Sequence, residues 1–109
     1  MDHPTTPRNF LVAGVQHRPT WELERDRFSR VVDPATLQVK LLGEPSNTYD
    51  RYAVKVLING VHIGYVPKAF SADFWGLHAL GYQAVAALVN FSPSAQPWQM
   101  YEIAVTFKK

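Results

Sequence analysis

The stretch that decides the fold runs from Tyr52 to Val66 and reads YAVKVLINGVHIGYV. Its central pair, Asn59-Gly60, is the preferred one for a two-residue type I′ hairpin turn, because both central positions of that turn require a positive φ. The turn sets the register of the flanking strands: when Ile58 pairs with Val61, Val56 lies opposite Ile63 and Val54 opposite Tyr65. One apolar face of the hairpin then carries Val54, Val56, Ile58, Val61, Ile63 and Tyr65. The pattern predicts a hairpin with one face in a core and the other toward solvent or a ligand.

Strand-like segments flank this hairpin on both sides. We expect strands at residues 10–17, 37–42, 84–91 and 100–107, where apolar residues recur with a period of two. Gly14 in the first of them marks a bulge or a close approach of the backbone. The last two strands each have an alternating face, formed by Val85, Ala87, Val89 and Phe91 and by Tyr101, Ile103, Val105 and Phe107.

One helix is expected, in residues 68–82. Phe70, Phe74 and Leu77 have helical spacing there, and Gly81 suits a C-terminal cap. Residues 18–36 are polar and irregular, and we expect a long excursion with at most a short helical turn. The fold class is therefore mainly β: a small antiparallel β-barrel of about six strands, with one helix between the central hairpin and the last two strands.

Length and composition are those of a single globular domain. The chain has 109 residues, of which 47% are hydrophobic and 18% charged, and we expect a flexible leader at residues 1–9 followed by one domain at residues 10–109. Cysteine is absent, which excludes disulfides and thiolate chemistry. No apolar run resembles a secretory signal or reaches membrane-spanning length, so we expect a cytoplasmic protein with no membrane partner.

The familiar signatures of catalysis are missing from the sequence. No serine lies in a GxSxG context, the four histidines show no metal-ligand spacing, and no glycine-rich phosphate loop is present. We therefore expect a non-catalytic protein with no metal or cofactor. The net charge of +2 and the isoelectric point of about 9.0 permit a nucleic-acid partner without requiring one.

The turn before the hairpin, EPSNTYD at residues 44–50, is the most distinctive polar stretch. Asn47 and Asp50 can satisfy backbone amides while Tyr49 packs over the barrel rim, and local chemistry by itself favours this structural interpretation. The same three side chains could instead stack on a base, accept a hydrogen bond from a hydroxyl and donate one to a phosphate or a base edge.

Residues 44–68, EPSNTYDRYAVKVLINGVHIGYVPK, resemble the central signature of HIRAN domains. That signature has the order Glu-Pro-x-Asn-x-Tyr-Asp, Ala-Val-x-Val and Gly-Tyr-Val-Pro, and FLVAGVQH at residues 10–17 is similar to the family's first strand. The resemblance covers most of the chain, from Phe10 to Phe107. It implies an OB-like β-barrel, of the type that stands alone in bacteria and phages or is attached to chromatin-type helicases and nucleases. The best understood member captures the 3′-hydroxyl end of single-stranded DNA.

The resemblance also implies which residues contact DNA. The family's tyrosine-aspartate pair, preceding asparagine, basic residue after the hairpin and aromatic of the penultimate strand correspond to Tyr49, Asp50, Asn47, Lys68 and Phe91. A carboxylate such as Asp50 accepts a hydrogen bond from a 3′-hydroxyl and repels a phosphate. Tyr49 and Phe91 would stack on bases, and Lys68 would neutralise phosphate.

This sequence departs from the end-binding member at two places. Gln16, His17 and Arg18 stand where that member has an arginine followed by two aromatic residues, and Tyr65 stands where it has a histidine. His17 can still stack on a base and Arg18 can still reach a phosphate. We therefore add His17, Arg18 and Tyr65 to the expected DNA-binding groove.

Two functions follow as hypotheses. The first is a non-catalytic module that binds single-stranded DNA or 3′-hydroxyl DNA ends and targets a helicase or nuclease partner acting in trans. The second is a protein-protein interaction module on the same barrel, in which an aromatic contact patch is formed by Trp21, Trp75 or Trp98.

Overall fold

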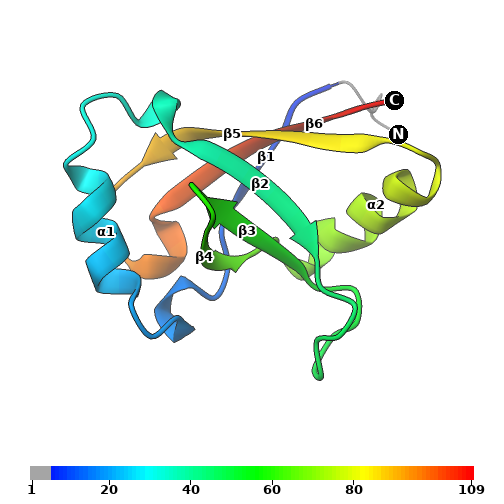
Figure 1. The fold of residues 1–109 in the computed structure, drawn as a ribbon, viewed down its shortest axis with the longest axis horizontal. Coiled ribbons are helices and arrows are strands. Elements are labelled where there is room, and N and C mark those ends of the chain that lie inside the picture. Colours follow the sequence, from blue (N-terminus) through cyan, green and yellow to red (C-terminus); the bar gives the residue numbers. More distant parts are fainter. Residues whose placement is uncertain (1–5) are drawn as a thin grey trace.

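The computed structural model describes residues 6–109. The elements in chain order are β1 (Arg8–Leu11), α1 (Trp21–Ser29), β2 (Gln38–Gly43), β3 (Val54–Ile58), β4 (Val61–Tyr65), α2 (Lys68–Ala79), β5 (Gln83–Phe91) and β6 (Tyr101–Lys108) (Figure 1). Three short 3₁₀ turns lie at Val15–His17, Pro34–Thr36 and Pro97–Gln99. Most of the expected leader lies outside the described residues, and Arg8 and Asn9 already belong to β1.

All six strands form one antiparallel sheet in the order β1-β6-β5-β2-β3-β4. The sheet curls until its two edges meet at one residue pair. The amide of Ala13 donates to the carbonyl of Tyr65, and the amide of Tyr65 donates to the carbonyl of Ala13, both at 2.8 Å. The predicted mainly β architecture of about six antiparallel strands, with a helix between the hairpin and the last two strands, is confirmed.

The central hairpin has the predicted turn but not the whole predicted register. Asn59 and Gly60 have φ values of 50° and 81°, as a type I′ turn requires. Beyond the pair formed by Leu57 and His62, Ile63 has no partner, and Val56 lies opposite Gly64. The prediction that Val56 faces Ile63 and Val54 faces Tyr65 is therefore wrong. The extra residue is a β-bulge, which reverses the face of every later side chain.

A second bulge changes the face of the end of β5. Leu88 lies opposite Ile103 and Asn90 opposite Glu102, so Val89 is the extra residue. Phe91 therefore turns to the core side, and its ring stacks on Tyr101 with centroids 5.1 Å apart. The prediction that Phe91 shares a face with Val85, Ala87 and Val89 is wrong beyond this bulge.

Two expectations for the N-terminal third are also corrected. The first strand ends at Leu11 rather than His17, because Gly14 adopts a φ of 73° and the chain turns into the 3₁₀ turn at Val15–His17. The segment expected to be irregular contains the nine-residue helix α1. The sequence shows no apolar face for this helix, since the helix buries a single residue, Phe28. Phe28 packs edge-on against Tyr101, with ring centroids 6.3 Å apart.

Helix α2 closes the open end of the curled sheet (Figure 1). Phe70 and Phe74 are buried. The helix ends at Ala79; Gly81, whose φ is 88°, follows the C-cap residue Leu80, and the amide of Tyr82 donates to the carbonyl of Leu77 at 3.0 Å. This is the expected glycine cap. Strand β6 supplies the centre of the core, where Tyr101, Ile103, Val105 and Phe107 are each at most 2% exposed. Among residues 6–109, no helix is long and apolar enough to cross a membrane.

Candidate nucleic-acid interface

The loop between β2 and β3 is built by its own polar side chains. The amide of Glu44 donates to the carbonyl of Ala53 at 2.8 Å and closes the loop at its base. Asn47 Oδ1 accepts from the amides of Tyr49 and Asp50, at 2.9 and 3.0 Å. Asp50 Oδ1 accepts from the amide of Tyr52 at 2.9 Å. Asn47 and Asp50 therefore hold the loop in one conformation, as the structural interpretation of this turn expected.

Two groups of the loop remain available to a ligand. The side chain of Tyr49 is 97% exposed, so the ring makes almost no contact with the rest of the domain. The second carboxylate oxygen of Asp50, Oδ2, has no hydrogen-bond partner within residues 6–109. A bare aromatic face beside a free carboxylate oxygen can accept a flat ring and a hydroxyl donor at the same time.

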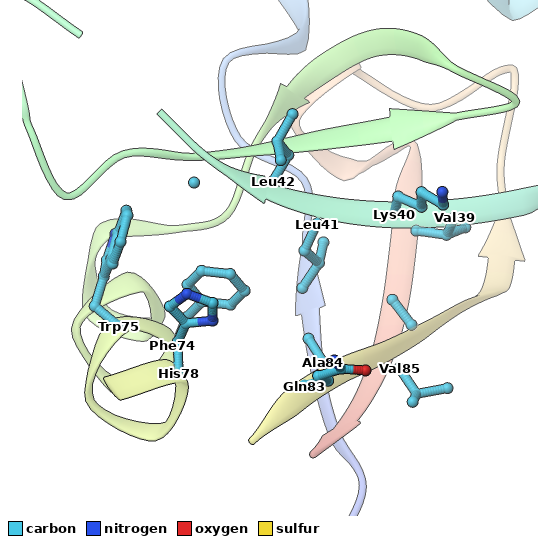
Figure 2. A pocket seen from close by; sticks show the side chains of 12 residues that line it. Val39, Lys40, Leu41, Leu42, Phe74, Trp75, His78, Gln83, Ala84 and Val85 are labelled. Carbon is cyan, nitrogen blue, oxygen red and sulfur yellow. The ribbon is translucent and has the colours of Figure 1, made fainter. Parts of the chain in front are cut away.

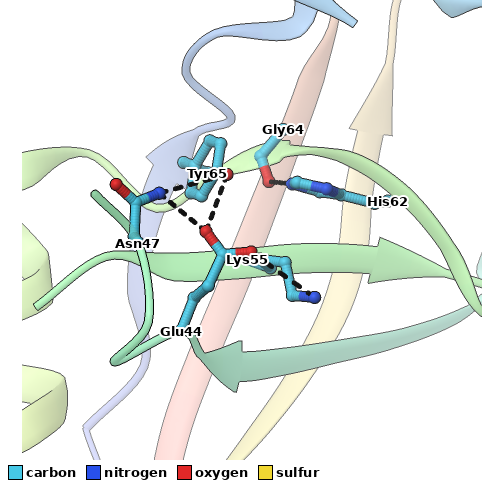
Figure 3. A network of polar contacts seen from close by, with 6 residues as sticks. All are labelled: Glu44, Asn47, Lys55, His62, Gly64 and Tyr65. Carbon is cyan, nitrogen blue, oxygen red and sulfur yellow. Dashed lines mark hydrogen bonds and ion pairs between the residues drawn. The ribbon is translucent and has the colours of Figure 1, made fainter. Parts of the chain in front are cut away.

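Behind the loop, Glu44 is the central acceptor of a polar network (Figure 3). Its Oε1 accepts from Asn47 Nδ2 at 2.6 Å and from the Tyr65 hydroxyl at 3.0 Å. Its Oε2 lies 3.6 Å from the ammonium of Lys55. Tyr65 reaches this network because the bulge at Ile63 turns it away from the core. The network connects the loop to β3 and β4.

The network shifts the pKa values of its members. The hydrogen bond from Asn47 is the main cause that lowers the pKa of Glu44 below its ordinary value of 4.5, against a smaller opposing effect of burial. Burial, followed by the hydrogen bond to Glu44, raises the pKa of Tyr65. Next to Tyr65, partial burial and then the charge of Arg18 lower the pKa of His62, whose Nε2 donates to the carbonyl of Gly64 at 2.9 Å.

These shifts predict that acidification destabilises the fold. As the pH falls, the unfolded chain binds protons at Glu44 and His62 before the folded chain does. The contribution of these two groups to stability is therefore fully present above their ordinary pKa values of 4.5 and 6.5, and it is lost as the pH falls through their pKa values in the folded chain. In urea unfolding from about pH 7 to about pH 3, Glu44→Gln should lose less stability below pH 4.5 than the unmodified protein. Its amide oxygen still accepts from Asn47 but does not titrate.

Glu22→Gln, an exposed position on α1, is the matched control for this measurement and should follow the unmodified protein. A Glu44→Gln curve with the same acid limb as the unmodified protein would contradict the role given to Glu44.

Five of the eight predicted site residues line one cavity of about 340 Å³. They come from the loop, the end of β4 and the start of α2: Asn47, Tyr49, Asp50, Tyr65 and Lys68. Lys68 is exposed as the first residue of α2 and forms no ion pair with any residue of the described part of the chain. The cavity therefore combines an aromatic ring, a carboxylate and a free ammonium group.

The other three predicted residues lie outside this cavity. His17 is exposed at the end of the 3₁₀ turn at Val15–His17. Arg18 lines a narrow crevice beside His62, and its Nε is buried without a hydrogen-bond partner among residues 6–109. Phe91 is partly buried, with one face covered by Tyr101.

Sequence reasoning missed three residues that shape the site. Glu44 organises the loop, and the signal for it was its fixed place in the order Glu-Pro-x-Asn. Tyr52, half exposed, lies near the end of the loop, and only its closeness to Asp50 in the sequence pointed to it. Trp75 of α2 donates from Nε1 to the carbonyl of Tyr52 at 2.7 Å, and no sequence signal indicated this contact.

The tryptophans of the alternative hypothesis come from three different elements. Trp21 of α1 is partly buried beside the guanidinium of Arg25, 5.3 Å from the ring centroid, and Trp75 packs against Phe74 and the loop. Trp98, in the 3₁₀ turn at Pro97–Gln99, is 51% exposed. Trp75 is thus part of the scaffold of the loop, and Trp98 is the most exposed of the three.

Another hollow contains none of the predicted DNA-binding residues. Strands β2 and β5 pair only near Val39 and then diverge, and Phe74, Trp75 and His78 of α2 lie between them (Figure 2). The resulting groove has a volume of about 560 Å³. It meets the loop at Trp75.

The fold is that of a small OB-like β domain, with a hollow in its rim at the β2–β3 loop and the start of α2. A sequence profile of the HIRAN domain matches residues 9–108, and the chain belongs to this family. HIRAN domains are generally DNA-binding modules.

The fold is similar to a solved structure, the crystal structure of the HIRAN domain of human HLTF. The two share 21% sequence identity with a TM-score of 0.67, over 96% of this chain and 78% of that chain. At this identity the similarity establishes the fold. No curated protein sequence matches the chain.

Proposed function

We propose that this HIRAN domain binds single-stranded DNA and recognises its 3′-hydroxyl end at the β2–β3 loop. The observation that supports this is the shared cavity of about 340 Å³, in which the exposed Tyr49, the free oxygen of Asp50 and the unpaired Lys68 meet. Each of these three groups offers an interaction that a terminal nucleotide can use.

The proposed recognition follows from charge and hydrogen bonding. A 3′-hydroxyl donates a hydrogen bond, which Asp50 Oδ2 accepts, whereas a 3′-phosphate or an internal phosphate brings negative charge against the same carboxylate. Lys68 neutralises the phosphate on the other side of the terminal sugar. Tyr49 stacks on the base, an interaction that tolerates any base because each has a π-face.

The remaining predicted residues have supporting roles in this proposal. Asn47 and Tyr65 hold the loop through Glu44, so that Tyr49 and Asp50 are presented without an ordering cost on binding. His17, Arg18 and Phe91 lie outside the cavity and contact nucleotides farther from the end. We further propose that the domain targets a helicase or nuclease, acting in trans in the cytoplasm, because capture of an end by itself does no chemistry.

The test is fluorescence anisotropy with short single-stranded DNA labelled at its 5′ end and carrying either a 3′-hydroxyl or a 3′-phosphate. The unmodified protein should prefer the hydroxyl by about tenfold, the equivalent of about 1.4 kcal/mol, and the affinity should fall with salt. Asp50→Asn should lose the preference, because its side-chain oxygen still accepts from the amide of Tyr52 while the negative charge is gone.

Asp33→Asn is the matched control. Asp33 is an exposed carboxylate that also accepts a backbone amide, from Ala35 at 3.0 Å, and it lies outside the cavity. Equal binding of both ends by the unmodified protein would reduce it to a general strand binder. Absence of binding at low salt would favour the protein-protein interaction module, with Trp98 as the first residue to replace.

A further inference from the structure

A second hollow of about 480 Å³ adjoins the first. The two share Asp50, Lys68 and Ser71, so they lie on either side of a common border. None of the remaining residues that line the second hollow was expected to contact DNA; they are Tyr52, Ala72, Trp75 and Gly76. The second hollow continues the proposed DNA-binding surface from the loop onto α2.

The shape of this hollow is set by small residues on one face of α2. Ala72 and Gly76 are four residues apart, so they lie one above the other on the helix surface. A Cβ atom placed on Gly76 would meet no atom within 4 Å, which shows how open the hollow is at that point. Tyr52, 50% exposed, and Trp75 form the aromatic rim. An apolar floor with an aromatic rim fits a flat ring.

The charges around the hollow favour an anionic chain. The guanidinium of Arg51 lies over the ring of Tyr52, 5.0 Å from its centroid, and Arg51 Nη2 donates to the Tyr52 hydroxyl at 2.8 Å. Neither Arg51 nor Lys68 forms an ion pair within the described chain. The nearby acid of α2, Asp73, is already paired with Arg8 at 2.7 Å. Among residues 6–109, two cations without an ion-pair partner therefore flank an aromatic surface, and Asp50, at the border with the first cavity, is the one carboxylate that lines the hollow.

The hollow is also held in place before any ligand binds. Trp75 Nε1 donates to the carbonyl of Tyr52 at 2.7 Å. The Trp75 ring lies directly on Gly43, where a Cβ atom would come within 2.5 Å of ring atom Cζ2. The absence of a side chain at Gly43 thus lets the ring join α2 to both ends of the loop. A preformed surface binds a ligand with little loss of conformational entropy.

We propose that this hollow is a second base-binding subsite, for the nucleotide that precedes the terminal one in single-stranded DNA. The inference rests on the proposed function, because it places the terminal nucleotide in the first cavity. The penultimate base stacks on Tyr52 above Ala72 and Gly76. The phosphate that links the two nucleotides lies beside Lys68, on the side of the terminal sugar away from Asp50, and Arg51 neutralises the next phosphate.

The test fills the hollow from the helix side. Gly76→Leu occupies the space without a clash at its Cβ and removes a glycine from a helix, so the variant should fold. Its affinity for a 3′-hydroxyl hexathymidylate should fall by about tenfold, the loss expected for one unstacked base. Tyr52→Ala, which removes the stacking face but keeps the backbone carbonyl that binds Trp75, should give a similar loss. Ala79→Leu, on the same helix but lining neither hollow, should bind as the unmodified protein does.

Two readouts separate this subsite from the proposed function. Gly76→Leu and Tyr52→Ala should keep the preference for a 3′-hydroxyl over a 3′-phosphate, and should bind thymidine 5′-phosphate, a competitor with one nucleotide, as the unmodified protein does. Undiminished hexamer affinity in both variants would overturn the subsite and leave end recognition intact. If the unmodified protein shows no preference for a 3′-hydroxyl over a 3′-phosphate, end recognition is overturned instead.

Discussion

Gly64→Ala should lower the free energy of unfolding by about 3 kcal/mol, at the upper end of the usual cost of overpacking. A Cβ atom at this position would lie 2.5 Å from the carbonyl oxygen of Ala13 and 2.6 Å from Val12 Cγ1. The Ala13 carbonyl cannot move aside freely, because it accepts the hydrogen bond from the amide of Tyr65 that joins the two edges of the sheet. The methyl group therefore strains the closure of the barrel.

Thermal and urea unfolding measure this effect, and the melting temperature should fall by roughly 10–20 °C. Gly76→Ala is the matched control, because it makes the same change on an exposed helix face where the new methyl group meets nothing. That control should gain up to about 1 kcal/mol from helix propensity. If Gly64→Ala has the same melting temperature as the unmodified protein, the pair formed by Ala13 and Tyr65 is not rigid.

Tyr49→Ala should weaken DNA binding by about 5- to 150-fold, the range for loss of one base-aromatic stack of about 1–3 kcal/mol. The same change should leave the unfolding free energy within about 0.5 kcal/mol of the unmodified value. Both results have one cause: the ring is 97% exposed, so it contributes almost nothing to folding and is available to a ligand. A large binding loss without a stability loss is the mark of an interface residue.

Anisotropy titration and thermal unfolding of the same preparations separate the two effects. Tyr49→Phe is the matched control; it keeps the ring, and the hydroxyl that it removes has no hydrogen-bond partner within residues 6–109. It should bind DNA like the unmodified protein. If Tyr49→Phe loses as much affinity as Tyr49→Ala, the hydroxyl rather than stacking is responsible. If Tyr49→Ala binds normally, the loop is purely structural.

Three expectations based on local signals were confirmed. The Asn59-Gly60 turn, the alternating core face of β6 and the glycine cap of α2 each depend on residues close together in the chain. The missed helix α1 has no such signal, since only Phe28 is buried and the rest of the segment is polar. Its position depends on contact between Phe28 and Tyr101, which are far apart in the sequence.

The candidate site divides in the same way. The pattern around Asn47, Tyr49 and Asp50 predicted a recognition loop, and the structure brings Tyr65 and Lys68 to it in one cavity. The sequence did not predict that Trp75 supports this loop, because their contact joins a helix to a segment 23 residues earlier. Nor did it predict the second hollow, because the small residues of α2 that form its floor, Ala72 and Gly76, belong to no recognisable motif.

The sequence by itself determined the hairpin turn, the alternation of β6, helix α2 and the polar loop, because each is set by the dihedral preferences and polarity of neighbouring residues. Only the tertiary structure decided which faces Tyr65 and Phe91 occupy. Each follows a single extra residue, Ile63 or Val89, whose bulge reverses the alternation of its strand. A bulge depends on how a strand fits its partner in a curled sheet, so no local pattern predicts that Tyr65 lines the first cavity or that one face of Phe91 packs on Tyr101.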